Sequence, residues 1–468
     1  MRRAYNNLLK NSLIFTLANF GNKLITFIMV PLYTYVLEPE AYGTIDIVTT
    51  TSSLVIPIVF MCVSDAVMRY TMSTKYEKED ILTNGIFIYF QGLLITFFAM
   101  LLFGRFPIIE QYKWFFFGVL ASNGLLLIFN QFLRSIDKVK EFAINGVLYT
   151  FSFVSCNIIF LLWLKRGING YLCSMIIANT ICIIYAFIMA RAWRYLVKHP
   201  SKEVLKIMLK YSVPLIPNSL MWWIMDASDK FVIAYFLGVN ANGIYAIAKK
   251  LPTIIDTFHG IFNQAWQISA IQENDTDNAI EFTSSIYKTY TILLFCVVSL
   301  LMVVSRPMVK YLLAAEYSES WKYIPLLLLS VALSSLSGLL SANFIANEKT
   351  GIIFKTTVYG AIINTVLNIV MIPIMGINGA AFATAFSFLV VLLIREQRII
   401  KQGNLLILFK RKTIIIIIIL EFIVYYMLSM WVTVGILTLL TVCLIFCYRD
   451  TILTIIKSMT EKIKRRGA

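Results

Sequence analysis

Long apolar segments separated by short polar breaks dominate the chain from Leu13 to Cys447. Most of them are about 20 residues long, the length with which an α-helix crosses a hydrocarbon layer of ~30 Å. The pattern predicts an all-α integral membrane protein with about fourteen transmembrane helices. The predicted spans are 12–36, 42–68, 82–103, 114–133, 142–164, 168–190, 211–237, 242–271, 282–304, 322–346, 352–374, 377–394, 413–430 and 432–448.

Composition supports this class and excludes others. Hydrophobic residues make up 59% of the chain and charged residues 14%, whereas soluble domains carry about 25% charged residues. The net charge of +16 is distributed over the predicted loops, so we expect no nucleic-acid partner. The seven cysteines lie in apolar segments without metal-ligand spacing, so neither a metal site nor a disulfide framework is expected. The apolar stretch after Arg2 and Arg3 has no signal-peptide cleavage pattern and predicts an uncleaved first helix.

The distribution of Lys and Arg predicts the orientation in the membrane. With the N-terminus in the cytoplasm, the inside segments contain 28 basic residues and the outside loops 7. Basic residues in short loops are retained on the cytoplasmic side, so both termini are predicted to be cytoplasmic. Two loops do not follow this rule, the acidic inside loop at 273–281 and the basic outside loop that contains Arg306, Lys310 and Lys322. The tail beyond Arg449 combines an apolar helical face with basic residues and is predicted to lie on the anionic leaflet.

Two short motifs recur at equivalent positions about 200 residues apart. Glu40-Ala41-Tyr42-Gly43 joins the first two predicted helices, and Asn240-Ala241-Asn242-Gly243 joins the seventh and eighth. The tetrapeptide Gly167-Ile168-Asn169-Gly170 is repeated as Gly376-Ile377-Asn378-Gly379 at the turns before helices 6 and 12. Six helices return the chain to its starting side, so the copies are parallel repeats of the kind found in transporters.

The duplication predicts a domain organisation. Residues 1–200 form an N-terminal six-helix lobe and the start of a basic cytoplasmic linker, and residues 201–405 form a second six-helix lobe around a shared central cavity. Residues 406–468 contain two additional helices and the basic amphipathic tail.

Polar and charged residues are aligned along the helices that form the duplicated pairs. At 100° per residue, Tyr245, Lys249, Asp256, His259, Asn263 and Gln267 share one face of the predicted helix 8. Helix 2 shows a similar line that begins at Asp46, and helix 1 aligns Asn19 with Lys23. Ionisable groups are costly in hydrocarbon and usually face a bundle interior or a wet cavity. The lines therefore predict the walls of a partly cationic cavity.

These lines supply the candidate site residues. The candidates for substrate binding are Lys23, Asn19, Lys249, Lys250, Lys230, Arg69 and His259, and the candidates for binding a coupling proton or sodium ion are Asp46, Asp226, Asp229 and Asp256. Two alternatives stay open. Asp226 and Lys230 are four residues apart and could form a bridge within their own helix, and His259 could either titrate or have a structural role.

The segment from Pro214 to Gly238, with Pro217-Asn218-Ser219, Trp222-Trp223, Ser228-Asp229-Lys230 and Tyr235-Phe236-Leu237-Gly238, resembles helix 7 of the oligosaccharide flippases, the Wzx-like proteins. Pro31-Leu32-Tyr33 with Glu40-Ala41-Tyr42-Gly43 is similar to their first helical hairpin. The superfamily also contains drug and toxin extruders and lipid II flippases. The resemblance implies two six-helix lobes around a central cavity.

The resemblance implies a function as well as a fold. Its substrate would be an oligosaccharide repeat unit on undecaprenyl pyrophosphate, moved between leaflets of a bacterial inner membrane for assembly of a surface polysaccharide such as O-antigen or capsule. Lys23 would bind the diphosphate, with Lys249 opposite it. A polysaccharide polymerase and a chain-length regulator are implied partners.

Two other functions remain possible on the sequence alone. A multidrug extruder of the same fold would favour an acidic and aromatic cavity, which Lys23, Lys249 and Lys250 argue against. An integral membrane enzyme, such as a polymerase or acyltransferase, would need a catalytic cluster at a membrane face, and the chain contains only two histidines. We therefore predict a transporter with no catalytic residues and no cofactor.

Overall fold

The computed structural model describes residues 25–73, 75–103, 107–197, 199–273, 279–347, 349–403, 405–406, 411–451 and 453. Within these ranges the regular structure is entirely helical. The helices are α2 (Val30–Val36), α3 (Pro39–Val59), α4 (Val63–Thr71), α5 (Lys78–Phe103), α6 (Pro107–Ser135), α7 (Val139–Asn157), α8 (Gly167–Ala190), α9 (Lys202–Ser212), α10 (Ile216–Leu237), α11 (Val239–Ala248), α12 (Thr253–Glu273), α13 (Ala279–Leu312), α14 (Ile324–Ala346), α15 (Thr350–Met375), α16 (Ile377–Lys401), α17 (Arg411–Met427) and α18 (Met430–Cys447). The predicted amphipathic face of the tail lies outside the described residues.

Ten of the described helices are long and apolar enough to cross a membrane. They match predicted spans 2 to 6, 9 to 12 and 14, although α3 accounts for only the first part of span 2. The remaining predicted spans correspond to α2, α10, the pair α11 and α12, and α17, which are shorter, interrupted or more polar. The structure confirms the prediction of an all-α, multi-pass membrane protein.

Two spans predicted as continuous helices are broken. Helix 2 stops at Val59 and restarts as α4 at Val63, because Met61 and Cys62 adopt left-handed backbone angles with φ of +52° and +50°. Helix 8 stops at Ala248 and restarts as α12 after Pro252, which lacks the N–H that a continuous helix needs. The single-helix prediction was wrong at both places. Interrupted membrane helices are tolerated where the irregular backbone is buried in protein or lines a cavity.

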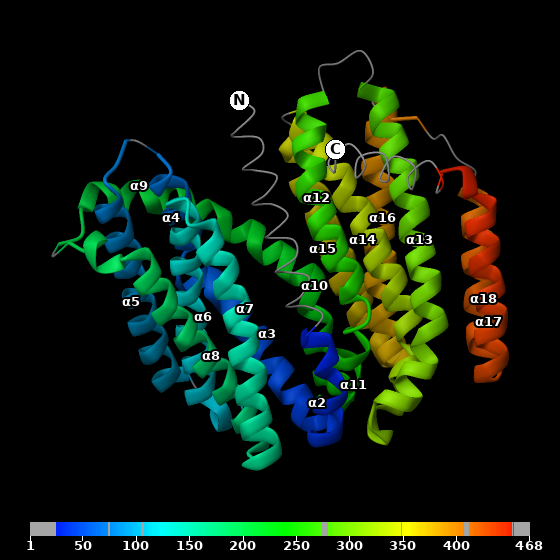
Figure 1. The fold of residues 1–468 in the computed structure, drawn as a ribbon, viewed down its shortest axis with the longest axis horizontal. Helices are drawn as coiled ribbons and strands as arrows, with labels where there is room; N and C mark the ends of the chain where they lie inside the picture. Colours follow the sequence, from blue (N-terminus) through cyan, green and yellow to red (C-terminus); the bar gives the residue numbers. More distant parts are fainter. Residues whose placement is uncertain are drawn as a thin grey trace, which may run out of the picture. The chain divides into compact units, whose positions relative to one another are not determined.

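The chain divides into two compact units, Met1–Ala246 and Ile247–Ala468. In unit 1, α3 packs against α5, α6, α8 and α10, and α4 packs against α6 and the amphipathic α9 (Figure 1). Buried amides join α6 to its neighbours, since Asn145 of α7 bonds to Asn130 and Asn179 of α8 bonds to Ser122 and Asn123. Such interhelical hydrogen bonds hold membrane helices together where hydrophobicity alone gives no driving force.

Unit 2 is built around α14. This helix contacts α12, α13, α15 and α16, and 72% of its most apolar window is buried, against 22% for α18. Helices α17 and α18 lie beside α13 at the edge of the unit (Figure 1). Glu421 of α17 accepts a hydrogen bond of 2.9 Å from Ser299 of α13. The unit boundary falls inside α11, whereas the sequence placed the lobe boundary at residue 200, and the lobe assignment stays a prediction.

The repeated tetrapeptide begins with a glycine of positive φ in both units. Gly167, the first residue of α8, and Gly376, the residue before α16, have φ of +51° and +61°, a conformation that glycine adopts without steric cost. At the fourth position, a Cβ on Gly379 would lie 2.3 Å from the Met371 carbonyl oxygen, and one on Gly170 would lie 3.0 Å from Arg166 Cβ. Both copies therefore need glycine for local conformation and for close helix packing.

The structure gives a role to the basic loop that broke the orientation rule. Arg306 donates hydrogen bonds of 2.9 Å to the Leu428 carbonyl oxygen at the end of α17 and to the Thr433 hydroxyl of α18. Its guanidinium also lies 4.0 Å from the centroid of the Trp321 ring. Arg306 thus fastens α17 and α18 to α13, a packing role unrelated to topology.

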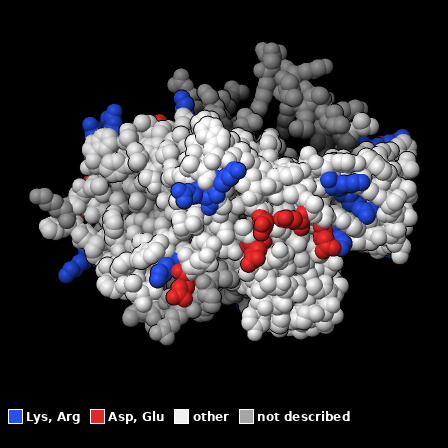
Figure 2. Space-filling model, turned by 90° about the horizontal axis from the view of Figure 1, so that it is seen from below, with Lys and Arg blue, Asp and Glu red and all other residues white. Residues whose placement is uncertain are grey.

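Charge is sparse on the face of the molecule seen in Figure 2, where Lys and Arg form small separate groups beside a short row of Asp and Glu.

One basic residue that the sequence assigned to an inside loop is buried in a helix instead. Helix α16 continues to Lys401, so Arg395 lies within it and is 1% exposed.

Candidate functional site

A buried network of charged and polar side chains joins α3, α10 and α11 in unit 1. The Lys230 ammonium of α10 lies 2.8 Å from Asp46 Oδ1 and 3.2 Å from Thr50 Oγ1, both on α3. The amide of Asn242 on α11 donates to Asp46 Oδ2 at 3.2 Å. The Lys230 and Asp46 side chains are 15% and 14% exposed. The structure thus brings together one predicted substrate-binding residue and one predicted coupling residue.

A second carboxylate continues this network along α10. Asp229 is 1% exposed. It accepts hydrogen bonds from the Tyr245 hydroxyl of α11 and from its neighbour, the Lys230 backbone N–H, at 2.9 Å. A buried carboxylate that accepts two hydrogen bonds keeps part of the stabilisation it had in water. We call Asp46, Thr50, Asp229, Lys230, Asn242 and Tyr245 the charged cluster.

Ala41-Tyr42-Gly43 and Ala241-Asn242-Gly243, which end the two recurring tetrapeptides, position the charged cluster by packing against each other. A Cβ on Gly43 would lie 2.1 Å from the Val239 carbonyl oxygen, and a Cβ on Gly243 would lie 1.8 Å from the Pro39 carbonyl oxygen. The contact is reciprocal, because each glycine faces the carbonyl four residues before the other. Only glycine permits this approach, and it brings Asn242 within 3.3 Å of the Gly43 carbonyl oxygen.

The other candidates in unit 1 lie elsewhere. Asp226 is exposed on α10. Arg69, near the end of α4, places its guanidinium 4.5 Å from the centroid of the Tyr211 ring of α9. This contact ties Arg69 to a helix that begins within the predicted basic linker. Asn19 and Lys23 lie outside the described residues.

The predicted polar face of helix 8 does not run along one helix. Lys249 and Lys250 lie half-buried in the turn between α11 and α12, and Asp256 is exposed in the first turn of α12. Tyr245 and Asp256 were placed on one face by assuming a rotation of 100° per residue along a continuous helix. The helix is broken between them, so they need not share a face. The prediction of a single unbroken stripe was therefore wrong.

His259 is packed among three helices of unit 2. Its Nδ1 lies 2.7 Å from the Tyr290 hydroxyl oxygen of α13. A Cβ on Gly338 of α14 would lie 2.6 Å from His259 Nε2. The side chain thus contributes to the packing of α12, α13 and α14.

Two buried polar groups in unit 2 were missed from the sequence. The Arg395 guanidinium donates to hydroxyls of α14 and α15, namely those of Ser337, Ser341, Thr356 and Thr357. Asn364 bonds to Thr384, and Asn368 bonds to Asn364. Ser and Thr in apolar runs carry little signal, so these partners could not be paired from the sequence. Within the described part of the chain, no group of three or more His, Cys, Asp or Glu could hold a metal ion.

The geometry defines a class of protein. Apolar spanning helices, two of them interrupted, with a charged cluster buried between membrane segments, are typical of secondary transporters. Residues 8–268, more than half of the chain, match the profile of the family described as "Polysaccharide biosynthesis protein". The chain belongs to this family of flippases and transporters, and the resemblance seen in the sequence is confirmed. Residues 267–445 match the profile described as "Lipid II flippase MurJ".

Related proteins agree with this assignment. The chain is 25% identical over 198 residues to the "Probable low-salt glycan biosynthesis flippase Agl15" of Haloferax volcanii, which covers 41% of this chain and 42% of that protein. It is 21% identical over 268 residues to a protein of the Lsg locus of Haemophilus influenzae, covering 55% of this chain and 64% of that protein. The chain thus spans less than two thirds of the length of both relatives.

Solved structures share the fold. The inward closed conformation of the lipid II flippase MurJ superimposes with a TM-score of 0.69 at 14% identity, covering 94% of this chain and 100% of that chain. An inward-facing multidrug resistance MATE transporter gives a TM-score of 0.64 at 13% identity, with 82% and 98% covered. These likenesses establish the architecture of the chain.

Proposed function

We propose that this protein is a flippase that moves an oligosaccharide repeat unit linked to undecaprenyl pyrophosphate from the cytoplasmic to the outer leaflet of the inner membrane. The observation that carries the proposal is the charged cluster. An ion pair between Lys230 and Asp46 joins α10 to α3, and the family to which the chain belongs is described as polysaccharide biosynthesis proteins. The product would serve assembly of a surface polysaccharide such as O-antigen, capsule or exopolysaccharide.

The charged cluster gives a physical route for the headgroup. A diphosphate cannot cross hydrocarbon unaided, because its charges would lose their water without replacement partners. A lysine paired with one carboxylate can exchange that partner for a phosphate at small net electrostatic cost. We propose that the headgroup competes with Asp46 for Lys230 while the polyprenyl chain stays in lipid, and that the lobes then reorient by alternating access.

The remaining candidates belong to the same proposal. The substrate-binding set is Lys23, Asn19, Lys249, Lys250, Lys230, Arg69 and His259, and the coupling set for a proton or sodium ion is Asp46, Asp226, Asp229 and Asp256. The protein would lie in the inner membrane with both termini cytoplasmic, and would act beside a polymerase and a chain-length regulator. Changing Lys23 or Lys249 to Ala should lower translocation without lowering protein level.

Depletion of this protein in its native cell tests the proposal against the multidrug alternative. A flippase predicts that lipid-linked oligosaccharide accumulates on the inner leaflet and that surface polysaccharide falls, with unchanged sensitivity to organic cations. An extruder predicts the reverse, namely increased sensitivity to cationic drugs with normal surface polysaccharide. That second result would refute the proposal.

A further inference from the structure

A pocket of about 320 Å³ lies in unit 1 beside the break between α3 and α4. Helices α3, α4, α6 and α10 supply its walls, and none of the residues proposed above for the diphosphate or the coupling ion lines it. The volume is at the lower end of the range of ~300–1,000 Å³ that ligand pockets occupy. The pocket therefore suits a small group, about the size of one ring.

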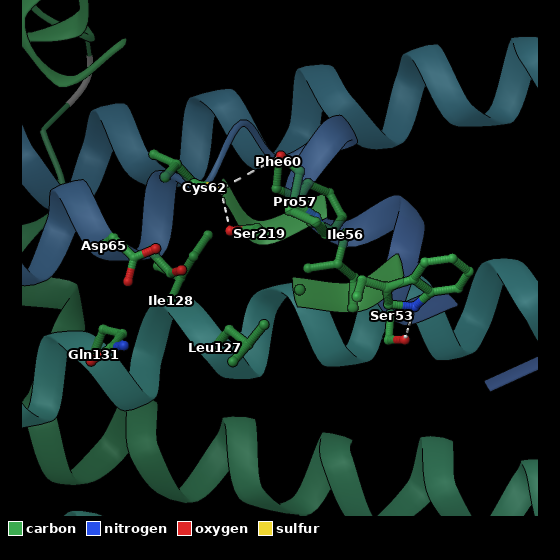
Figure 3. A pocket seen from close by; sticks show the side chains of 14 residues that line it. Ser53, Ile56, Pro57, Phe60, Cys62, Asp65, Leu127, Ile128, Gln131 and Ser219 are labelled. Carbon is green, nitrogen blue, oxygen red and sulfur yellow. Dashed lines mark hydrogen bonds between the residues drawn. The ribbon is translucent and has the colours of Figure 1, made fainter. Parts of the chain in front are cut away.

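One end of the pocket is polar. Asp65 of α4 and Gln131 of α6 lie at the same end of the pocket (Figure 3). Ser64 also lines the pocket. In the described part of the chain, no hydrogen bond or ion pair engages the Asp65 carboxylate. The Gln131 carbonyl accepts a hydrogen bond of 3.1 Å from Arg134, which leaves its amide N–H groups to face a ligand. This end offers both acceptors and donors.

An indole with a fixed orientation lines another wall. Trp223 Nε1 donates to Ser53 Oγ at 3.1 Å and to the Thr50 carbonyl oxygen at 3.3 Å. Ser53 in turn donates to the same carbonyl at 2.7 Å, and it lies away from Asp65 and Gln131 in Figure 3. Because its N–H is already bonded, Trp223 offers the pocket only its aromatic surface.

The backbone at the pocket is strained. Met61 and Cys62 both have positive φ, a conformation that is sterically unfavourable for residues other than glycine. The resulting break brings the first turn of α4, with Ser64 and Asp65, to the pocket. Such outliers persist where the surrounding structure requires them, often at ligand sites.

We propose that this pocket binds one sugar ring of the lipid-linked substrate, separately from the site of its diphosphate. Sugar hydroxyls both donate and accept, as do Ser64 and Gln131, and a carboxylate accepts from them strongly. The apolar C–H face of a sugar ring packs against an aromatic surface such as that of Trp223. The inference rests on the proposed function, because the sugar belongs to the same substrate.

The charge of the pocket argues against the other parts of that substrate. Asp65 is the only charged residue among the described residues that line it, so a diphosphate would be repelled. A polyprenyl chain would leave Asp65, Ser64 and the amide N–H groups of Gln131 without polar partners, which is costly in a dry site. A small organic cation is the remaining rival, since it would pair with Asp65 and stack on Trp223.

Saturation-transfer difference NMR on the full-length protein in lipid nanodiscs separates these ligands. The probes are the methyl glycosides of glucose, galactose and N-acetylglucosamine, together with tetraphenylphosphonium and inorganic pyrophosphate. At least one glycoside should bind with a dissociation constant in the roughly millimolar range. Trp223→Phe and Asp65→Asn should each weaken it about tenfold, the effect of losing a stacking surface or a hydrogen bond to a charged group.

Two matched controls define specificity. Trp222→Phe changes the adjacent, exposed indole, and Asp450→Asn removes an exposed carboxylate, and neither residue lines the pocket. Both variants should bind the glycoside as the wild type does. Gln131→Leu serves as a further pocket variant if either of the first two does not fold, judged by gel filtration.

Three results would overturn the proposal: no glycoside binding by the wild type, equal binding by all pocket variants, or Asp65-dependent binding of tetraphenylphosphonium alone. Translocation by wild-type protein in vesicles is measured in parallel. Translocation without glycoside binding would reject the sugar pocket and leave the flippase proposal standing. Glycoside binding without translocation would contradict the flippase proposal and leave only the affinity of the pocket for sugars.

Discussion

At the scale of single residues, the main feature is the partnership of Lys230 with Asp46. The two residues are 184 positions apart in the sequence and come from different helices. Removing one partner of a buried ion pair leaves the other charge unpaired in a poorly solvated site, and this costs more than the pair contributes. The pair is thus both a stability element of unit 1 and the proposed point of exchange with the substrate.

A double-mutant cycle on this pair tests both roles. Lys230→Met and Asp46→Asn should each lower the apparent unfolding temperature, and the double variant should recover part of the loss. A coupling free energy of about 0.5–3 kcal/mol is expected for residues in direct contact. Thermal unfolding of purified protein, followed by gel filtration, measures it. Strictly additive losses would show that the 2.8 Å contact makes no net contribution.

The sequence predicted that both residues lie on membrane helices, but it could not pair them. Asp226 lies four residues from Lys230 in the same helix and was an equally plausible partner. Contacts between different helices depend on how each helix is rotated about its axis, which the sequence does not give. The structure assigns Lys230 to Asp46. Arg395 shows the same limit, since its hydroxyl partners lie on two other helices.

At the scale of secondary-structure elements, helix contacts are set by glycine. The reciprocal approach of Gly43 and Gly243 leaves no room for a methyl group, because the obstructing atoms belong to the backbone. Overpacking of this kind forces backbone shifts that cost about 1–3 kcal/mol or more. The motif repeat was visible in the sequence, but the contact between its two copies was not.

Gly43→Ala and Gly243→Ala should each destabilise the protein and reduce the yield of folded material. The matched control is Gly260→Ala in α12, where a Cβ would have nothing within 4 Å. That variant should be neutral or stabilised by up to about 1 kcal/mol, because alanine favours helix more than glycine does. Equal unfolding temperatures for Gly43→Ala and Gly260→Ala would contradict the close packing of α3 and α11.

The left-handed backbone at the break between α3 and α4 leads to a second prediction, about the stability of variants at residue 61. Met61→Gly should preserve or raise stability, since glycine adopts positive φ without strain. Met61→Val should lower it by more than about 1 kcal/mol, because β-branched residues tolerate this conformation least. The apparent unfolding temperatures of the two variants provide the comparison. If valine is tolerated as well as glycine, the backbone at residue 61 is not left-handed.

The spans themselves were predictable because about twenty apolar residues in a row are a strong signal. The breaks within the spans were harder to predict. Polar residues continue on both sides of each break, so the alignment of side chains gave the impression of one helix. Pro57 and Pro252 were the available signals, and a proline inside an apolar run does not by itself show whether a helix bends or stops.

At the scale of the whole molecule, the chain is a multi-pass membrane protein of a polysaccharide biosynthesis family. Its proposed function requires that a charged headgroup find partners inside the membrane while the lipid tail stays outside. In the two proposals made above, the charged cluster supplies a cation for the diphosphate and the pocket beside α4 supplies a polar site for the sugar. Composition alone would have suggested only a membrane protein.

The predicted orientation belongs to this scale as well. A green fluorescent protein fused after residue 468 should fluoresce, and alkaline phosphatase inserted at residue 166 should be active, because the first is expected inside and the second outside. The inside loop near residue 137 supplies the control, where phosphatase should be inactive. The opposite pattern at all three sites would place both termini outside and reverse the proposed direction of transport.

The most direct test of the central claim is translocation by the purified protein in sealed vesicles. A fluorescent lipid-linked oligosaccharide with an undecaprenyl pyrophosphate anchor is placed in both leaflets, and its accessibility to an external lectin or quencher is followed after an ion gradient is imposed. The account predicts that wild-type protein changes the leaflet distribution and that Lys230→Met does so much more slowly. Wild-type vesicles that behave like protein-free vesicles, or a Lys230→Met variant as fast as wild type, would contradict it.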